Sequence, residues 1–130
     1  MKANELTIGD WVRSPKNADG DFYAGQVCEI MQGVEHYYCN IPGPDGNDSI
    51  RCDDLSPVPL TVEILEKNGF ECRGGLWNLP GEDMGFKQLA ATFAIYPYYA
   101  DPTIHLCEIM FVHELQHALR LCGIEKEIVL

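Results

Sequence analysis

The segment SPVPLT, from Ser56 to Thr61, divides the sequence into two parts of different pattern. Its prolines fix their own φ angles and push the residues before them toward extended conformations, so the segment predicts a stiff connector. The residues before it have the pattern of short strands, whereas those after it mix helical and strand patterns. We therefore predict an α+β fold with an N-terminal unit over residues 1–56 and a C-terminal unit over residues 57–130.

The N-terminal part contains short β-rich runs, each bounded by residues that favour turns. The predicted strands are Trp11 to Ser14, Tyr23 to Met31, Val34 to Ile41 and Ser49 to Leu55. Such closely spaced short strands favour a small β-barrel of SH3-like type.

The C-terminal part begins with a predicted helix, Val62 to Asn68, which Thr61 caps and Gly69 ends. A hairpin bent at Gly74 and Gly75 and a strand region over residues 86–99 follow, although the run QLAATFA in that region also fits a helix. We predict antiparallel strands here.

The last thirty residues combine a strand pattern with a helical one. Ile104 to Val112 is almost continuously apolar, which predicts a central strand covered on both faces. His113 to Cys122 has helical spacing, Gly123 follows as a helix-ending residue, and Glu125 to Leu130 is predicted as a last strand.

Composition narrows the class of protein. Of the 130 residues 46% are apolar and 22% are charged, as in an ordinary globular protein. The net charge of -11 disfavours nucleic acid as a partner, because that affinity comes from clustered Lys and Arg. There is no apolar leader and no run long enough for a membrane span, so we expect a cytoplasmic protein with no membrane partner and six reduced cysteines.

The pentapeptide HELQH contains the HExxH spacing of zinc hydrolases. In that chemistry His113 and His117 would bind Zn²⁺, and Glu114 would act as general base on the bound water. A catalytic zinc normally has a third protein ligand. Nothing in the spacing of His36 or His105 marks either one as that ligand.

The helical wheel of residues 113–122 also argues against a zinc site at HELQH. Leu115, Ala118, Leu119 and Cys122 form one apolar stripe, and His113, His117 and Arg120 centre on the opposite side. We therefore expect both histidines to face solvent, with a guanidinium beside them that would repel a divalent cation. The motif is also expected in the first turns of its helix, and we interpret it as a false positive.

Two other patterns have both a structural and a functional interpretation. Trp11, Tyr23, Tyr37 and Tyr38 could line a groove for a proline-rich peptide, although aromatic residues at strand spacing more often pack in a core. The acidic loops NADGD and PDGND resemble calcium loops in composition but lack the EF-hand order, which favours surface turns.

Three segments carry a resemblance to a family: MKANELTIGDWV at the start, PVPLTVEILEKNGFE in the middle and CEIMFVHELQHALRLCGIEKEI near the end. The chain resembles small uncharacterised proteins of gut anaerobic bacteria, often encoded near prophage or mobile-element genes. Their pattern reads MKANELRIGN, PIPLTEE with NGF, and YVHELQN. In it the place of His117 usually holds asparagine, so the resemblance implies that HELQH is a structural segment, and it implies no known activity or cofactor.

Together these observations favour a non-enzymatic, phage- or mobile-element-associated protein that acts through protein contacts, without catalytic, cofactor-binding or metal residues. One alternative is a minimal zinc-dependent hydrolase that uses His113, Glu114 and His117. A second alternative is an acidic mimic of nucleic acid.

Overall fold

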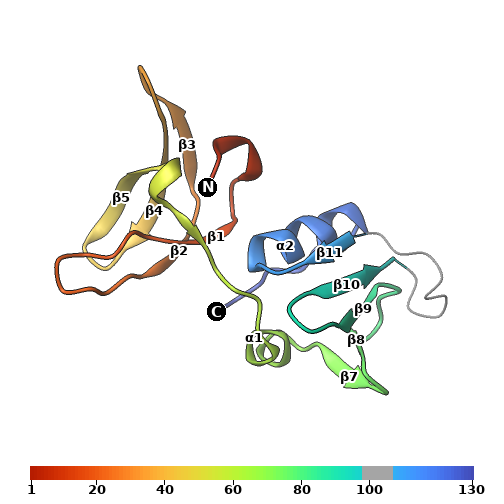
Figure 1. The fold of residues 1–130 in the computed structure, drawn as a ribbon. Coiled ribbons are helices and arrows are strands. Elements are labelled where there is room, and N and C mark those ends of the chain that lie inside the picture. The colour runs from red at the N-terminus through yellow and green to blue at the C-terminus, as the bar shows by residue number, and fades with distance from the viewer. Residues whose placement is uncertain (98–106) are drawn as a thin grey trace. The chain divides into compact units, whose positions relative to one another are not determined.

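The computed structural model of the chain describes residues 1–97 and 107–130 (Figure 1). These residues form a mixed α+β fold with many short strands and two α-helices. They divide into two compact units, Met1–Val58 and Pro59–Leu130, called unit 1 and unit 2. Neither α-helix is long and apolar enough to cross a membrane.

Unit 1 consists of two three-stranded antiparallel sheets, with strand orders β2-β1-β6 and β3-β4-β5. Its elements are the 3-10 helix η1 (Ala3–Glu5), β1 (Trp11–Arg13), β2 (Ala24–Gln26), β3 (Glu29–Gln32), β4 (Tyr37–Gly43), β5 (Gly46–Arg51), the 3-10 helix η2 (Cys52–Asp54) and β6 (Ser56–Pro57). The strand predicted over Tyr23 to Met31 is in fact two strands, one in each sheet. The sheets do not close, so the predicted barrel is not established.

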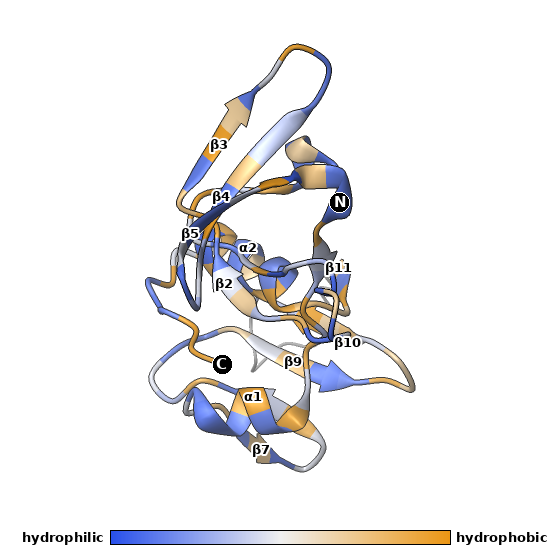
Figure 2. Ribbon diagram, turned by 90° about the vertical axis from the view of Figure 1, so that its left-hand side faces the viewer, coloured by the Kyte–Doolittle hydropathy of each residue, from blue (hydrophilic) through white to orange (hydrophobic). Residues whose placement is uncertain are grey.

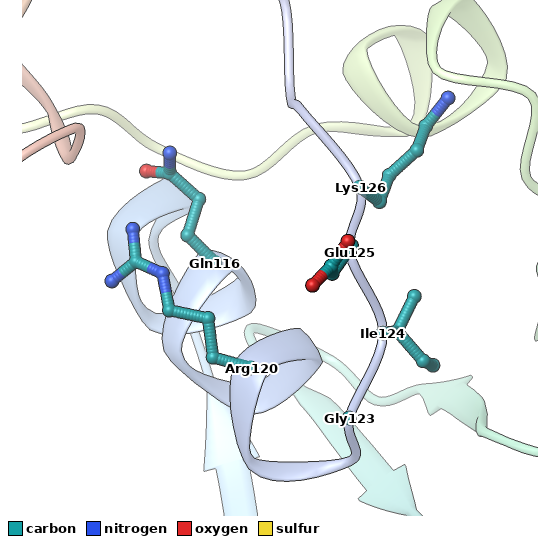
Figure 3. A pocket seen from close by; sticks show the side chains of 6 residues that line it. All are labelled: Gln116, Arg120, Gly123, Ile124, Glu125 and Lys126. Atoms are coloured by element: carbon teal, nitrogen blue, oxygen red, sulfur yellow. The ribbon is translucent and has the colours of Figure 1, made fainter.

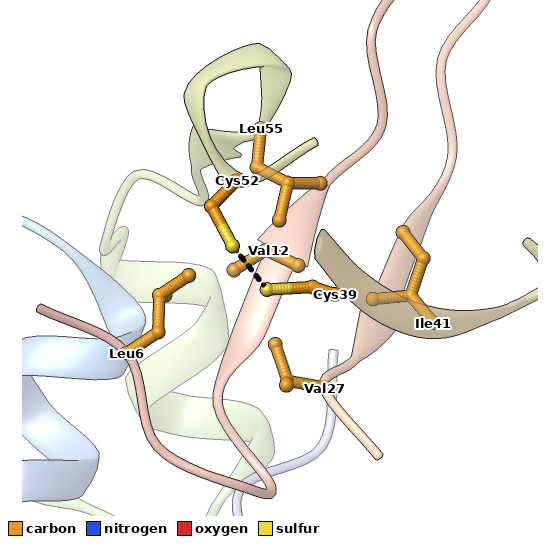
Figure 4. Packing of buried hydrophobic residues seen from close by; sticks show 7 residues of the cluster. All are labelled: Leu6, Val12, Val27, Cys39, Ile41, Cys52 and Leu55. Atoms are coloured by element: carbon orange, nitrogen blue, oxygen red, sulfur yellow. Dashed lines mark hydrogen bonds between the residues drawn. The ribbon is translucent and has the colours of Figure 1, made fainter. Parts of the chain in front are cut away.

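The core of unit 1 lies where β2 approaches β4. A Cβ atom on Gly25 would lie 2.8 Å from the carbonyl oxygen of Pro42, so only glycine fits at this position. Figure 4 shows the buried side chains of this core. They are Leu6, Val12, Val27, Cys39, Ile41, Cys52 and Leu55.

Unit 2 contains a five-stranded antiparallel sheet in which sequential strands are neighbours, with the order β11-β10-β9-β8-β7. Its elements are α1 (Val62–Lys67), β7 (Glu71–Arg73), β8 (Leu76–Asn78), β9 (Gly85–Gln88), β10 (Phe93–Tyr96), β11 (Cys107–Ile109) and α2 (Val112–Leu121). Phe86 is fully buried, and the centroid of its ring lies 5.4 Å from that of Phe70 and 5.8 Å from that of Phe93.

Two local predictions for unit 2 are confirmed. The backbone nitrogen of Ile64 donates to the hydroxyl of Thr61, which caps α1, and Gly69 has a φ of 82° just after the helix. Figure 2 shows apolar and polar residues side by side on this short helix. The predicted hairpin also forms, because Gly74 and Gly75 both take positive φ between β7 and β8.

The strand predicted over Ile104 to Val112 is corrected. In the described part of the chain the strand is β11, Cys107–Ile109, and it lies at the edge of the sheet. Its burial alternates, so one face is covered rather than both. Val112 belongs to α2, and residues 104–106 lie outside the described residues.

The strand predicted over Glu125 to Leu130 is wrong, since no part of that segment is a strand. The side-chain amide of Asn68 instead satisfies the backbone there. Its nitrogen donates to the carbonyl oxygens of Ile64 and Val129 at 2.7 Å each, and its oxygen accepts from the nitrogen of Val129 at 2.8 Å. The side chain of Asn68 thus supplies the hydrogen bonds to the backbone of Val129 that a neighbouring strand would otherwise supply.

Replacing Asn68 with alanine is expected to lower the free energy of unfolding of unit 2 by roughly 2 kcal/mol, because partly buried backbone groups of Ile64 and Val129 lose their partners. The measurement is urea denaturation followed by Trp77 fluorescence in a Trp11→Phe background. Gln88→Ala, which removes an exposed amide of the same unit, is the control, with an expected change below about 0.5 kcal/mol. Equal effects of both variants would contradict this account.

Candidate functional site

The HELQH segment lies in the first turns of α2, as predicted, because the helix begins at Val112. The carboxylate of Glu114 accepts hydrogen bonds from the backbone nitrogens of Met110 at 2.7 Å and Phe111 at 3.0 Å. These donors precede the helix, so Glu114 closes its N-terminal end. The carboxylate that a zinc hydrolase would use as its general base is therefore engaged in hydrogen bonds with the backbone.

The prediction that both histidines face solvent is wrong for His113, which is 7% exposed. Its ring stacks on Phe111 with 5.9 Å between centroids and meets the ring of His117 edge-on at 5.7 Å. These aromatic contacts contribute to the burial of the imidazole, whose ring packs on the ring of Phe111. His117 is half-buried and Arg120 is exposed.

Among residues 1–97 and 107–130, no group of three or more His, Cys, Asp or Glu side chains could hold a metal ion. Of the upstream donors considered from sequence, His36 belongs to unit 1, where its Nδ1 lies 3.3 Å from the guanidinium of Arg51. His105 lies outside the described residues. The described residues thus give His113 and His117 no third ligand.

A pocket of about 440 Å³ lies at the other end of α2 (Figure 3). Its walls are Gln116, Arg120 and residues 123–126, so neither histidine of the motif lines it. Basic and acidic side chains both line it, and Glu125 extends toward α2 in Figure 3. This mixed lining gives no preference for one ligand charge.

Cys107 and Cys122, which lie near α2 in the sequence, have raised pKa values. Burial, followed by the charge of Glu114, raises the pKa of Cys107. Burial, followed by the charge of Cys107, raises the pKa of Cys122. Because the thiolate is the reactive form, the raised pKa lowers the fraction of each thiol that can act as a nucleophile at neutral pH.

The second pocket to consider lies entirely in unit 1 and has a volume of about 410 Å³. It is lined by the loop between β1 and β2 and by the turn between β4 and β5, which lie at the same end of the unit in Figure 1. Its walls include Pro15, Asp21, Tyr23, Pro44, Asp45 and Asp48. We call it the acidic pocket.

Two of the residues that line the acidic pocket, Tyr23 and Asp48, contact each other. The phenol donates a hydrogen bond to that carboxylate. Gly43 allows this contact, because a Cβ there would lie 2.6 Å from the Asp48 carboxylate and 3.0 Å from the phenol oxygen. Burial, followed by the hydrogen bond to Asp48 and its charge, raises the pKa of Tyr23 to about 12. The phenol is therefore a neutral donor at physiological pH.

The loop that forms one wall is internally ordered. The side-chain oxygen of Asn17 accepts from the backbone nitrogens of Asp19 at 3.0 Å and Asp21 at 2.9 Å. Ser14 and Tyr23 join the two ends of this loop. The backbone nitrogen of Ser14 donates to the carbonyl oxygen of Tyr23, and the hydroxyl of Ser14 accepts from the backbone nitrogen of Tyr23. Asn17 thus uses its oxygen to shape the loop, as in a surface turn.

The electrostatics of the acidic pocket favour a cation. Asp21, Asp45 and Asp48 contribute three carboxylates, and no Lys or Arg is among its lining residues. Phe22 at its rim is 49% exposed, and the guanidinium of Arg13 lies 4.7 Å from the centroid of its ring. An aromatic face at this rim therefore already holds one guanidinium by a cation–π contact.

The loops NADGD and PDGND are both conspicuous in the sequence, but their residue pattern does not indicate that they line one pocket. The less favoured interpretation, in which Trp11, Tyr23, Tyr37 and Tyr38 line one groove, finds no support, since Tyr23 and Tyr37 line different pockets. Tyr37 and Tyr38 are successive residues of β4 and point to opposite faces. Tyr37 lines a different pocket, of about 550 Å³, together with Ile30 and Lys2.

Comparisons with protein-family models, with curated proteins and with solved structures gave no match for this chain. The geometry of the described residues is therefore the basis for the functional argument.

We expect the purified protein to carry no stoichiometric zinc, because Glu114 is held by the backbone and the described part of the chain supplies no third ligand. Elemental analysis after dialysis checks this. Addition of Zn²⁺ should change the thermal midpoint of unfolding by less than about 1 °C. A structural zinc would raise that midpoint clearly, because its binding free energy adds to the free energy of folding. One tightly bound zinc per chain that is lost in His117→Ala would contradict the expectation.

Substitution of Glu114 by alanine should destabilise unit 2 by about 1–2 kcal/mol, the range of a lost helix cap. Glu114→Gln should lose less, because the amide oxygen still accepts a hydrogen bond. Glu127→Ala removes an exposed carboxylate of the same unit and should change stability by less than about 0.5 kcal/mol. Urea denaturation gives all three values. A catalytic base would show the reverse pattern, with unchanged stability.

Proposed function

We propose that the protein is a binding module whose acidic pocket takes a positively charged, extended segment of another protein. The observation that carries the proposal is the convergence of three carboxylates, two prolines and Tyr23 in one pocket without a basic residue in its lining. Carboxylates attract Arg and Lys, and the ring and prolines offer apolar walls.

The order of the walls supports the same proposal. The loop between β1 and β2 is shaped by Asn17, and Tyr23 is held by its hydrogen bond to Asp48. Walls that are ordered in advance lose little conformational entropy when a partner binds. The net charge of -11 adds long-range attraction for a basic partner.

Two finer expectations belong to the proposal. Unit 1 as an SH3-like barrel is supported by its two small sheets, which meet at Gly25. A role in a phage or mobile-element context rests on the resemblance of the three sequence segments. Both are consistent with a non-enzymatic protein that acts through protein contacts.

The test uses a fluorescein-labelled peptide of alternating arginine and proline, which is basic and extended. Fluorescence anisotropy in 150 mM salt should give saturable binding to the wild type. The Asp21→Asn/Asp45→Asn double variant should bind about tenfold more weakly, equivalent to about 1.4 kcal/mol. These two carboxylates are exposed, so their loss should leave the thermal midpoint nearly unchanged.

The matched control is the Glu82→Gln/Asp83→Asn double variant, which removes the same charge from exposed positions of unit 2. It should bind the peptide within about twofold of the wild type, because exposed charges that do not line the pocket act on the peptide mainly through screened, long-range attraction at this salt concentration. Equal weakening by both double variants would mean non-specific attraction and would refute the proposal.

A further inference from the structure

Two buried cysteines of unit 1 lie side by side in its core (Figure 4). Cys39, in β4, has no exposed surface, and Cys52, the first residue of η2, is 2% exposed. Their Sγ atoms are 2.8 Å apart. A disulfide bond has a length of about 2.05 Å, so a shift of under roughly 1 Å would join the two atoms.

We propose that Cys39 and Cys52 are an oxidative modification site, at which a low-molecular-weight disulfide such as oxidised glutathione introduces an intramolecular disulfide. The thiolate of one cysteine attacks the glutathione disulfide, which forms a mixed disulfide and releases one glutathione. The second thiolate then attacks the protein sulfur of the mixed disulfide and releases another glutathione. Both cysteines are oxidised, one glutathione disulfide is reduced, and the two thiol protons go to the two released glutathiones.

Burial makes the first step slow, and the proximity of the two sulfurs makes the second step fast. Burial, followed by the hydrogen bond with Cys52 and its charge, raises the pKa of Cys39 to about 12, so the folded protein presents little thiolate. The reagent therefore reaches the pair only when unit 1 opens. Once one sulfur is modified, refolding brings the other against it at a high effective concentration.

The site differs in kind from the other cysteines. Cys28 and Cys72 are exposed and are open to the reagent without any opening of the fold. The cross-link would join β4 to η2, whose second residue, Asp53, lines the pocket that contains Tyr37. Oxidation would thus fix the wall of a pocket separate from the acidic one.

The experiment incubates the full chain with oxidised glutathione, quenches it with iodoacetamide in denaturant and maps the peptides by mass spectrometry. Trypsin combined with a glutamate-specific protease separates residues 36–51, with Cys39, from residues 52–63, with Cys52. We expect these two peptides to be disulfide-linked. Calorimetry should show a midpoint for unit 1 raised on the order of 10 °C, because the cross-link restrains the unfolded chain.

Urea below the unfolding transition should speed this linkage, whereas modification of Cys72 should stay at its original rate. Cys72→Ser should retain the linkage and the rise in midpoint, and Cys52→Ser should lose both. Glutathione on Cys39 and Cys52 without linkage between them, or a linkage to Cys28 instead, would overturn the proposal. Because the peptide map of the wild type decides this, the test does not depend on the folding of any variant.

Discussion

The close approach of β2 to β4 at Gly25 is the constraint on which unit 1 depends. The Pro42 carbonyl oxygen, 2.8 Å from where a Cβ would be, belongs to a backbone that cannot move aside as a flexible side chain could. The two sheets therefore pack closely enough for Val27 and Ile41 to share one core. The same approach carries Tyr23, which immediately precedes β2, over the end of β4 to Asp48.

Features set by neighbouring residues were predictable from the sequence, and features set by distant ones were not. The cap of α1 by Thr61 and the hairpin at Gly74 and Gly75 follow from backbone preferences over a few residues. The break between β2 and β3 does not, since it depends on which sheet each half joins. The C-terminal segment was misassigned for a similar reason, because its partner is Asn68, 61 positions away from Val129.

In the candidate site, too, features set by neighbouring residues were predictable and features set by distant residues were not. HELQH suggested chemistry because its spacing places two imidazoles and a carboxylate together, yet the carboxylate of Glu114 serves the backbone just before the helix. The wheel located the apolar stripe of α2 correctly but could not foresee that Phe111 would stack on His113. The acidic pocket was out of reach from sequence, because its walls come from loops that meet only in the folded unit.

The hydrogen bonds of Asn68 also bear on how the protein ages chemically. Asn68 precedes Gly69, and an Asn-Gly pair deamidates when the glycine nitrogen attacks the side-chain amide. Here both ends of that amide are held by Val129, and the Gly69 nitrogen donates to the carbonyl of Glu66 at 3.1 Å. Deamidation would therefore proceed mainly from opened molecules, and the carboxylate that it leaves could no longer donate to two carbonyl oxygens. Each such event would leave the carbonyl oxygens of Ile64 and Val129 without this donor, so the rate of this chemical damage is tied to how rarely unit 2 opens.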